Sequence, residues 1–253
     1  MDLGLADRVF VLTGASKGLG YATAQALVAD GARVVISARD RSRVDAAVAE
    51  LGGSAAGVVA DLAAESTPRL LADAARERFG RFDGALISVG GPPRGTSVET
   101  TDEQWRAAFE TVFLGTVRAA RTFAEVLAGT GGGAIGLVLS SSVRSPIEGL
   151  GVSNGLRPGL AAVAKEMSDE YARRNVRVLS LLPGRLLTDR NVELFAASGD
   201  PERAEREAAA TIPLGRLGEP AEFGRVAAFA LSPAASYLTG LSIPVDGGYL
   251  RLP

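Results

Sequence analysis

The sequence predicts an α/β protein built on a doubly wound parallel sheet, with helices covering both faces. Short apolar runs rich in Val, Ile and Leu alternate along the chain with longer amphipathic stretches. The runs are apolar at consecutive positions, which is typical of strands buried on both faces. Because the segments between the runs are too long for hairpin loops, crossover helices must connect the strands. With no linker and no repeat, residues 1–253 are expected to form a single domain.

The individual elements follow from this alternation. The first strand is expected at residues 8–12, directly before a glycine-rich turn, and the first helix at 18–30 directly after that turn. The glycine run at 129–133 is interpreted as a helix-to-strand turn, because an apolar strand pattern resumes immediately after it. The remaining strands are expected at 33–37, 57–60, 85–88, 134–139, 176–182 and 241–245, and the remaining helices at about 40–51, 65–80, 101–128, 153–174 and 219–231.

The composition excludes several classes of function. The chain has 27 Lys and Arg against 29 Asp and Glu, and this near balance offers no electrostatic footprint for nucleic acid or an anionic membrane. It has no Cys and no His, so disulfides, thiol nucleophiles, Cys/His metal sites and Ser-His-Asp triads are excluded. We expect no metal site. Any proton chemistry must use Ser, Tyr, Lys, Arg, carboxylates, backbone groups or water.

The start of the chain predicts a cytoplasmic protein, because a strand pattern begins at once and no leader pattern precedes it. Two uncharged runs, 126–143 and 226–245, contain glycines or prolines and are interpreted as a helix end, a turn and a buried strand, not as membrane spans. The stretch 186–215 breaks the strand and helix rhythm. It is expected to form a lid over a ligand crevice, and the alternative is a solvated helix pair with no role in binding.

A glycine-rich turn follows the first strand and opens the first helix. Such a turn lets the backbone approach a pyrophosphate, whose charge is favoured by the free N–H groups and the positive end of the helix dipole. The second strand ends about 20 residues later, which is the context that a dinucleotide-binding turn requires. The candidate cofactor-binding residues in the turn are Gly14, Ser16, Lys17, Gly18, Leu19 and Gly20.

The tip of the second strand predicts NADP(H) as the cofactor. Ala38 and Arg39 stand where an acidic residue would accept the ribose hydroxyls of NAD, and an arginine can instead pair with a 2′-phosphate. Lys17 adds a second cation near the same phosphate. The alternative for Arg39 is a solvated arginine at a helix start.

At this point the sequence resembles the short-chain dehydrogenase/reductase superfamily over nearly its whole length. Residues 13–20 carry the resemblance together with Asp61-Leu62, Pro183-Gly184 with Thr188, and Asp246-Gly247-Gly248. The resemblance implies a Rossmann-type fold and a nicotinamide cofactor. It adds Asp61, Leu62, Gly90, Pro183, Gly184 and Thr188 to the cofactor-binding residues.

The same comparison shows where this chain departs from the superfamily pattern. Members usually carry an Asn in the helix at the position of Val112, then a Ser, and then a Tyr followed four residues later by a Lys. Here the Ser is Ser140, and the Tyr and Lys positions fall on Ser153 and Arg157. The resemblance therefore assigns Ser140, Ser153 and Arg157 as the candidate catalytic residues, with Arg157 also toward the cofactor.

These departures change the expected chemistry. A phenol has a reference pKa of about 10 and can be tuned toward neutrality, whereas the hydroxyl of Ser153 is a far weaker acid. Arg157 keeps charge and donors for ribose hydroxyls, but a guanidinium does not shuttle a proton. Among the tyrosines, Tyr249 is the one that could reach the crevice from a tail, although a tyrosine there more often packs at an interface.

Other residues have both a functional and a structural interpretation. Ser140 could orient a substrate oxygen at the end of the fifth strand, or bond its own turn backbone. Arg94, Arg144 and Glu148 could bind a carboxylate or supply a proton, but each is more often a solvated loop charge. Trp105 and Phe109 are expected to form a helix packing face.

The leading hypothesis is an NADPH-dependent oxidoreductase with atypical proton delivery that reduces a small carbonyl, imine or conjugated alkene. The alternatives are a non-redox cyclase, dehydratase or isomerase in the same crevice, and a catalytically silent NADP-binding subunit. We expect a small-molecule substrate and no nucleic-acid or membrane partner. A homodimer or homotetramer is expected through the helices at 101–128 and 153–174, where Ala119, Ala120, Ala161, Ala162 and Ala164 would allow close packing. The alternative is that the same helix faces cover the chain's own sheet.

Overall fold

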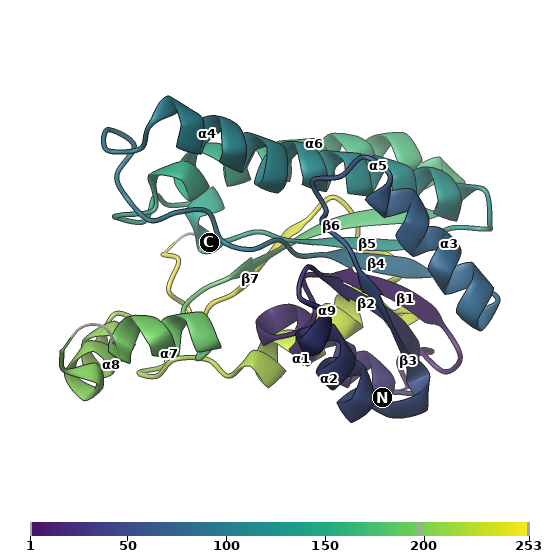
Figure 1. Ribbon diagram of the computed structural model, residues 1–253, viewed down its shortest axis with the longest axis horizontal. Helices are drawn as coiled ribbons and strands as arrows, with labels where there is room; N and C mark the ends of the chain where they lie inside the picture. Colours follow the sequence, from purple (N-terminus) through teal and green to yellow (C-terminus); the bar gives the residue numbers. More distant parts are fainter. Residues whose placement is uncertain (1, 197–198, 252–253) are drawn as a thin grey trace.

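One parallel sheet organises the protein. The structure is a computed structural model that describes residues 2–196 and 199–251, and these residues form a seven-stranded sheet in the order β3-β2-β1-β4-β5-β6-β7 (Figure 1). The order reverses between β1 and β4, so a crevice opens at their carboxyl ends, where sheets of this type bind ligands. The strands are β1 (Val9–Thr13), β2 (Arg33–Ala38), β3 (Ala55–Val59), β4 (Gly84–Ile87), β5 (Gly133–Val138), β6 (Val176–Pro183) and β7 (Ser242–Val245).

Helices cover both faces of the sheet, as the sequence predicts. One layer holds α3 (Thr67–Phe79), α4 (Asp102–Ala108), α5 (Gly115–Ala128) and α6 (Gly151–Tyr171), and the other holds α1 (Gly18–Ala29), α2 (Arg41–Leu51) and α9 (Pro220–Leu231) (Figure 1). Side chains from alternate positions of β1 enter the two layers: Val9 and Val11 face one core, and Phe10 and Leu12 face the other. The helices α1 and α9 pack so closely that a Cβ on Gly224 would lie 2.4 Å from the Ala22 carbonyl oxygen.

Residues 101–128 do not form the single α-helix that the sequence predicts. A π-helical turn over Phe109–Leu114 separates α4 from α5 and shifts the helical register between them. Tertiary contacts hold this turn, because Val112 is buried and a Cβ on Gly115 would lie 3.0 Å from the Leu62 carbonyl oxygen. Hydrophobic periodicity does not reveal such a shift, since the apolar stripe continues on both sides of it.

The small residues expected at a subunit interface are placed differently. Ala119 and Ala120 are fully buried, and Ala164 is buried too, and all three pack in the chain's own core beside the sheet. They cannot serve contacts between subunits, because the sheet of the same chain already covers them. Ala161 is partly buried and Ala162 is exposed, so these two stay available on the outer face of α6.

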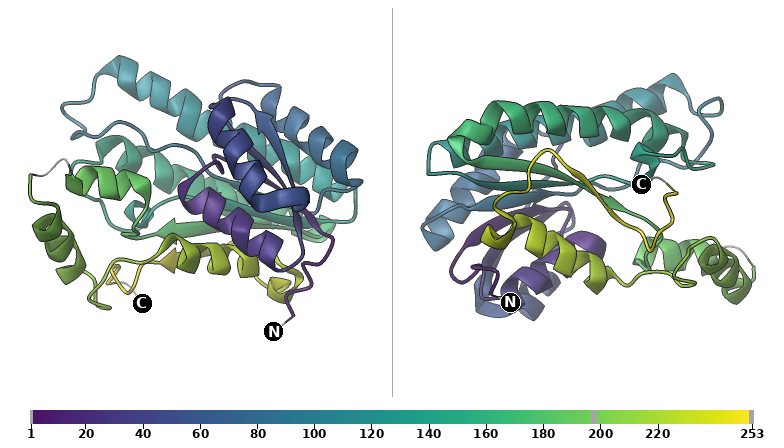
Figure 2. Two further views of the ribbon diagram at one scale, coloured as in Figure 1. Left: turned by 60° about the horizontal axis from the view of Figure 1, so that its bottom comes forward. Right: turned by 180° about the vertical axis from the view of Figure 1, so that it is seen from behind.

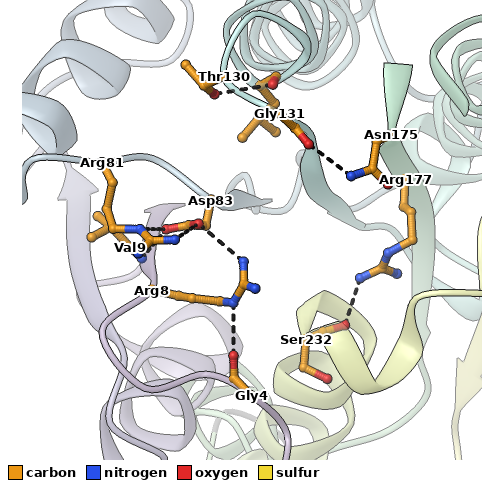
Figure 3. A network of polar contacts seen from close by, with 11 residues as sticks. Gly4, Arg8, Val9, Arg81, Asp83, Thr130, Gly131, Asn175, Arg177 and Ser232 are labelled. Atoms are coloured by element: carbon orange, nitrogen blue, oxygen red, sulfur yellow. Dashed lines mark hydrogen bonds and ion pairs between the residues drawn. The ribbon is translucent and has the colours of Figure 1, made fainter. Parts of the chain in front are cut away.

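The amino-terminal edge of the sheet is tied by a polar network around Asp83 (Figure 3). The Asp83 carboxylate accepts a hydrogen bond of 2.8 Å from the Val9 N–H, which joins the start of β1 to the start of β4. Arg8 and Arg81 pair with the same carboxylate at 3.3 Å and 2.6 Å. The starts of the strands lie opposite the crevice, so this network supports the fold and takes no part in the candidate site.

A partly buried arginine fixes the end of α9 to β6. Arg177 donates to the carbonyl oxygens of Ala230, Ser232 and Leu238 at 2.9–3.0 Å (Figure 3 shows the bond to Ser232). Burial lowers the pKa of Arg177 to about 10, so the side chain stays a cation at neutral pH. The carbonyl groups at the end of the helix thus gain charged donors in place of water.

The segment at 186–215 stands apart from the layered body. It forms α7 (Asp189–Ala196) and α8 (Pro201–Ala210), which project to one side on the crevice edge of the sheet (Figure 2). Ala208, Ile212 and Leu217 form a small apolar cluster of their own at its base, and Tyr249 packs against it. None of the described helices is long and apolar enough to cross a membrane.

Candidate active site

The glycine-rich turn is shaped by close backbone contacts. Gly14 has a φ of 58°, and a Cβ there would lie 2.7 Å from the Ser88 carbonyl oxygen. A Cβ on Gly20 would lie 2.9 Å from the Ala15 Cα, so only glycine lets α1 approach the turn. Thr13 locks the turn to the end of β4, because its hydroxyl donates to the Ser88 carbonyl and accepts from the Ser88 N–H.

A large cavity runs along this turn at the carboxyl ends of β1, β2 and β4. Its volume is about 790 Å³, and an adjoining cavity of about 240 Å³ shares Gly14, Lys17 and Gly90 with it. Atoms built on Gly18 or Gly90 would meet nothing within 4 Å, so the glycines leave open space beside the start of α1. A cradle of this size, with free N–H groups at a helix start, fits a dinucleotide. The turn, Asp61 and Leu62 would hold it.

Cations surround the end of this cavity at the tip of β2. Lys17, Arg39 and Arg43 all line it, and Ala38 stands where an acid would meet a ribose. Asp40 also lies there, but its carboxylate caps α2 by accepting from the Ser42 hydroxyl and the Arg43 N–H. These bonds lower the pKa of Asp40. The tip therefore presents net positive charge toward the cavity.

Arg43 was not among the residues expected from the sequence. Its signal was its place in the first turn of the helix that follows the second strand, and its side chain lines the same cavity as Arg39. Lys17 has a partner as well: its ammonium lies 3.8 Å from the Asp189 carboxylate at the start of α7. This exposed ion pair links the glycine-rich turn to the 186–215 segment.

A third cavity, of about 190 Å³, lies next to the cofactor cradle and is called the smaller cavity below. The three candidate catalytic residues line it. Ser140 follows β5, whereas Ser153 and Arg157 come from the first two turns of α6. The Ser153 hydroxyl is buried and lies 3.2 Å from the Ser142 hydroxyl. The Ser140 hydroxyl accepts from the Ser142 N–H at 3.0 Å, which is the hydrogen bond to its own turn backbone that the sequence left open. Ser140 also lines the cavity.

Arg157 is held in a fixed position although it carries a charge. It is only 6% exposed, and one of its terminal nitrogens donates to the carbonyl oxygens of Val138 and Leu139 at 2.9 Å each. The guanidinium lines both the cavity of about 190 Å³ and the cavity of about 240 Å³ that adjoins the cradle, so it lies between these two. It supplies positive potential there and can donate to hydroxyl groups, but it holds its proton throughout.

No tyrosine is among the lining residues of these three cavities. The Tyr21 hydroxyl donates to Glu50 and the Tyr171 hydroxyl donates to Glu125, both at the surface. Burial, and next the neighbouring carboxylate, raises the pKa of each phenol to about 12. Tyr237 is fully exposed. Tyr249 packs at the base of the 186–215 segment, with its ring 5.9 Å from the Arg185 guanidinium.

The other candidate side chains divide clearly. Trp105 packs against α6, because a Cβ on Gly155 would lie 2.8 Å from its ring, and Phe109 stacks on Phe113 with ring centroids 5.1 Å apart. Trp105 thus packs as the sequence predicts, whereas Phe109 is 42% exposed. Arg144 and Glu148 are exposed and line none of the three cavities, whereas Arg94 lines the smaller one.

The carboxyl end of β6 completes the smaller cavity. Pro183, Gly184 and Thr188 line it together with Asn191, whose side chain donates to the Leu186 carbonyl at 2.7 Å. The sequence did not predict Asn191 as a site residue, because no local pattern indicates that α7 and α6 meet at one cavity. All the predicted site residues thus line at least one of the three cavities, and their roles stay predictions. Among the described residues no cluster of acidic side chains could hold a metal ion.

Comparisons with known proteins agree with this geometry. The family model described as enoyl-(acyl carrier protein) reductase matches residues 14–250. The dehydrogenase/reductase SDR family member 4 of Bos taurus is 34% identical, over 97% of this chain and 88% of its own length. The chain belongs to the short-chain dehydrogenase/reductase superfamily. It is an oxidoreductase of this superfamily, and its fold agrees with that assignment.

Two solved structures of superfamily members resemble this short-chain dehydrogenase/reductase closely. L-sorbose reductase from Gluconobacter frateurii, complexed with NADPH and L-sorbose, superposes with a TM-score of 0.95 at 28% identity, and each chain is covered completely. The 3-ketoacyl-(acyl-carrier-protein) reductase of Brucella melitensis, complexed with NADH, gives a TM-score of 0.86 at 26% identity, with 97% of this chain and 99% of that chain covered. The fold prediction is therefore confirmed.

Proposed function

We propose that this protein is an NADPH-dependent reductase of a small carbonyl, imine or conjugated alkene, in which no tyrosine delivers the proton. The observation that carries the proposal is the placement of Ser153 and Arg157 on the wall of the smaller cavity. They stand where the superfamily pattern has its Tyr and Lys, and all four tyrosines of the chain lie elsewhere.

Charge supports NADP(H) over NAD(H). The two superfamily structures above hold NADPH in one case and NADH in the other, so likeness alone does not choose between them. In this chain Lys17, Arg39 and Arg43 line the end of the cradle, and the carboxylate of Asp40 is engaged in capping α2. A 2′-phosphate would meet these cations at the tip of β2, and the Asp40 carboxylate beside them is already hydrogen-bonded to the Ser42 hydroxyl and the Arg43 N–H.

The chain's own residues bind and orient the acceptor. NADPH, when bound, supplies the hydride. The hydroxyls of Ser140 and Ser153 can donate to the atom that gains electron density, and Arg157 adds positive potential beside it. These groups would stabilise the charge that develops on that atom during reduction, and where the product needs a proton, water would supply it. A protonated imine suits this arrangement best, because hydride addition to it gives a neutral amine and needs no further acid, whereas a ketone gives a basic alkoxide that must be protonated. A conjugated alkene joined to a carbonyl gives an enolate, whose charge is shared between carbon and oxygen.

The segment 186–215 serves as the lid in this proposal. Thr188 and Asn191 reach the smaller cavity from the start of the segment, and Asp189 pairs with Lys17 across the mouth. A phosphate bound near Lys17 would compete for that ammonium, so the cofactor and the lid would be coupled. We further propose a homodimer or homotetramer, whose mass light scattering would measure.

The test is a spectrophotometric assay of NADPH with a panel of ketones, imines and conjugated alkenes. Oxidation of NADPH with a stoichiometric reduced product supports the proposal. Conversion of a substrate without NADPH oxidation would replace it with non-redox chemistry. Cofactor binding without any conversion across the three classes would identify a silent subunit.

A further inference from the structure

The smaller cavity has an unbalanced positive lining. Arg94 and Arg157 both line it, and among the lining residues that the structure describes there is no Asp or Glu. Neutral groups, including Ser140, Ser153, Thr188 and Asn191, form most of the remaining wall. A partly enclosed site whose described lining holds cationic side chains and no carboxylate side chain favours an anionic ligand.

Arg94 is the cation that is available for a ligand. Among the residues that the structure describes, no ion pair or hydrogen bond involves its side chain. Glu99 accepts from the Thr96 N–H and hydroxyl, and neither Glu99 nor Glu148 lines the smaller cavity. Arg94 lines the smaller cavity and neither of the other two, so it faces the substrate and not the cofactor cradle.

The backbone next to Arg94 is anchored to the start of α6. Gly95 donates to the Gly149 carbonyl at 3.0 Å and accepts from the Gly151 N–H at 2.9 Å. The two segments are so close that a Cβ on Gly151 would lie 2.4 Å from the Ser97 nitrogen. The backbone at Arg94 is therefore fixed beside the start of α6, although the Arg94 side chain is exposed. This start, Gly151, lies two residues before Ser153 in the chain.

We propose that the substrate carries a carboxylate, which Arg94 binds, while its reducible bond lies at Ser140 and Ser153. A guanidinium fork matches a carboxylate with two parallel hydrogen bonds, which fixes the orientation of the ligand as well as adding affinity. The volume of about 190 Å³ is below the ~300–1,000 Å³ of pockets for drug-sized ligands, so the acid is small. The inference rests on the proposed function, since it takes the same cavity as the substrate site.

The test measures binding and not turnover. The protein loaded with NADP⁺ is titrated by calorimetry with 2-oxobutyrate, 2-oxoisovalerate and crotonate, and with the methyl ester of each. At least one acid should bind roughly tenfold or more tightly than its ester, since a charge-assisted contact contributes about 1.5–3 kcal/mol. Arg94→Gln should weaken binding of that acid by a similar factor, remove the preference over the ester and leave NADP⁺ affinity unchanged.

Arg144→Gln is the matched control, because Arg144 is exposed on the neighbouring loop and lines none of the cavities. It should bind the acid like the unmodified protein. Esters that bind as tightly as acids throughout the panel, or an Arg94→Gln protein that keeps the acid preference, would overturn the proposal. The result is independent of the reductase assignment: acid binding through Arg94 without NADPH oxidation refutes only the reduction, and oxidation with neutral substrates alone refutes only the carboxylate.

Discussion

Replacement of Ser153 by alanine tests the central claim about proton delivery. The Ser153 hydroxyl is 5% exposed and lies 3.2 Å from the Ser142 hydroxyl, so the substitution removes one neutral hydrogen-bonding group from the cavity wall. If Ser153 only donates a hydrogen bond to the acceptor, its loss costs about 0.5–1.5 kcal/mol in the transition state. Turnover should then fall roughly two- to tenfold.

A general acid would give a much larger effect. Loss of a positioned proton donor lowers turnover by roughly 10²- to 10⁴-fold. The assay is the steady-state rate of NADPH oxidation at saturating acceptor, together with the NADPH affinity of each protein. Ser142→Ala is the companion variant, because it removes the hydrogen-bond partner and leaves the Ser153 hydroxyl in the cavity. An inactive Ser153→Ala protein with unchanged NADPH affinity and fold would refute the reasoning and make Ser153 the proton donor.

Four further predictions concern the cofactor and the scaffold. Arg39→Asp should reverse the preference for NADP(H) over NAD(H), because a charge-assisted contact of ~1.5–3 kcal/mol is lost and a ribose acceptor is gained; fluorescence titration measures it. Gly20→Ala should abolish cofactor binding or folding, since its Cβ would lie 2.9 Å from backbone atoms; circular dichroism and the same titration distinguish the two. Arg177→Met should lower the free energy of unfolding by about 3 kcal/mol in urea, because three carbonyl groups lose charged donors. The pKa of Tyr171 is raised to about 12, so its bond to Glu125 stabilises the fold fully below pH 10 and less as the pH rises toward 12; Tyr171→Phe should remove this alkaline loss.

Matched controls are available for each of these variants. Arg41→Asp changes the same charge next to the cradle without lining it, and Gly53→Ala adds a Cβ in open space at an ordinary φ. Arg173→Met and Tyr237→Phe change exposed side chains. Equal losses in a variant and its control would contradict the structural reason given for that variant.

Local sequence determined much of the framework. Consecutive apolar residues predict buried parallel strands because both faces of such strands meet helices, and the observed strands lie within about two residues of the expected ones. The glycine-rich turn, the cations Lys17 and Arg39 and the hydroxyl at position 153 are also readable from the chain, because motif spacing along one crossover fixes what lies at one strand end. Absence of His and Cys was decisive for the chemistry before any fold was known.

Tertiary structure decided what the periodicity of single elements does not contain. An apolar stripe shows that a helix face is covered, but not by which partner, so the sequence left both a subunit contact and the chain's own sheet open for Ala119 and Ala120. The structure places both residues in the chain's own core. The π-helical turn ends at Gly115, which lies close to the Leu62 carbonyl, a contact that the sequence does not reveal. Arg94 reaches the cavity of Ser153 from a loop about 60 residues away along the chain, and Asn191 reaches it from α7, about 40 residues away. Such long-range placement follows from strand order and loop anchoring, because those bring distant residues together without leaving a local pattern.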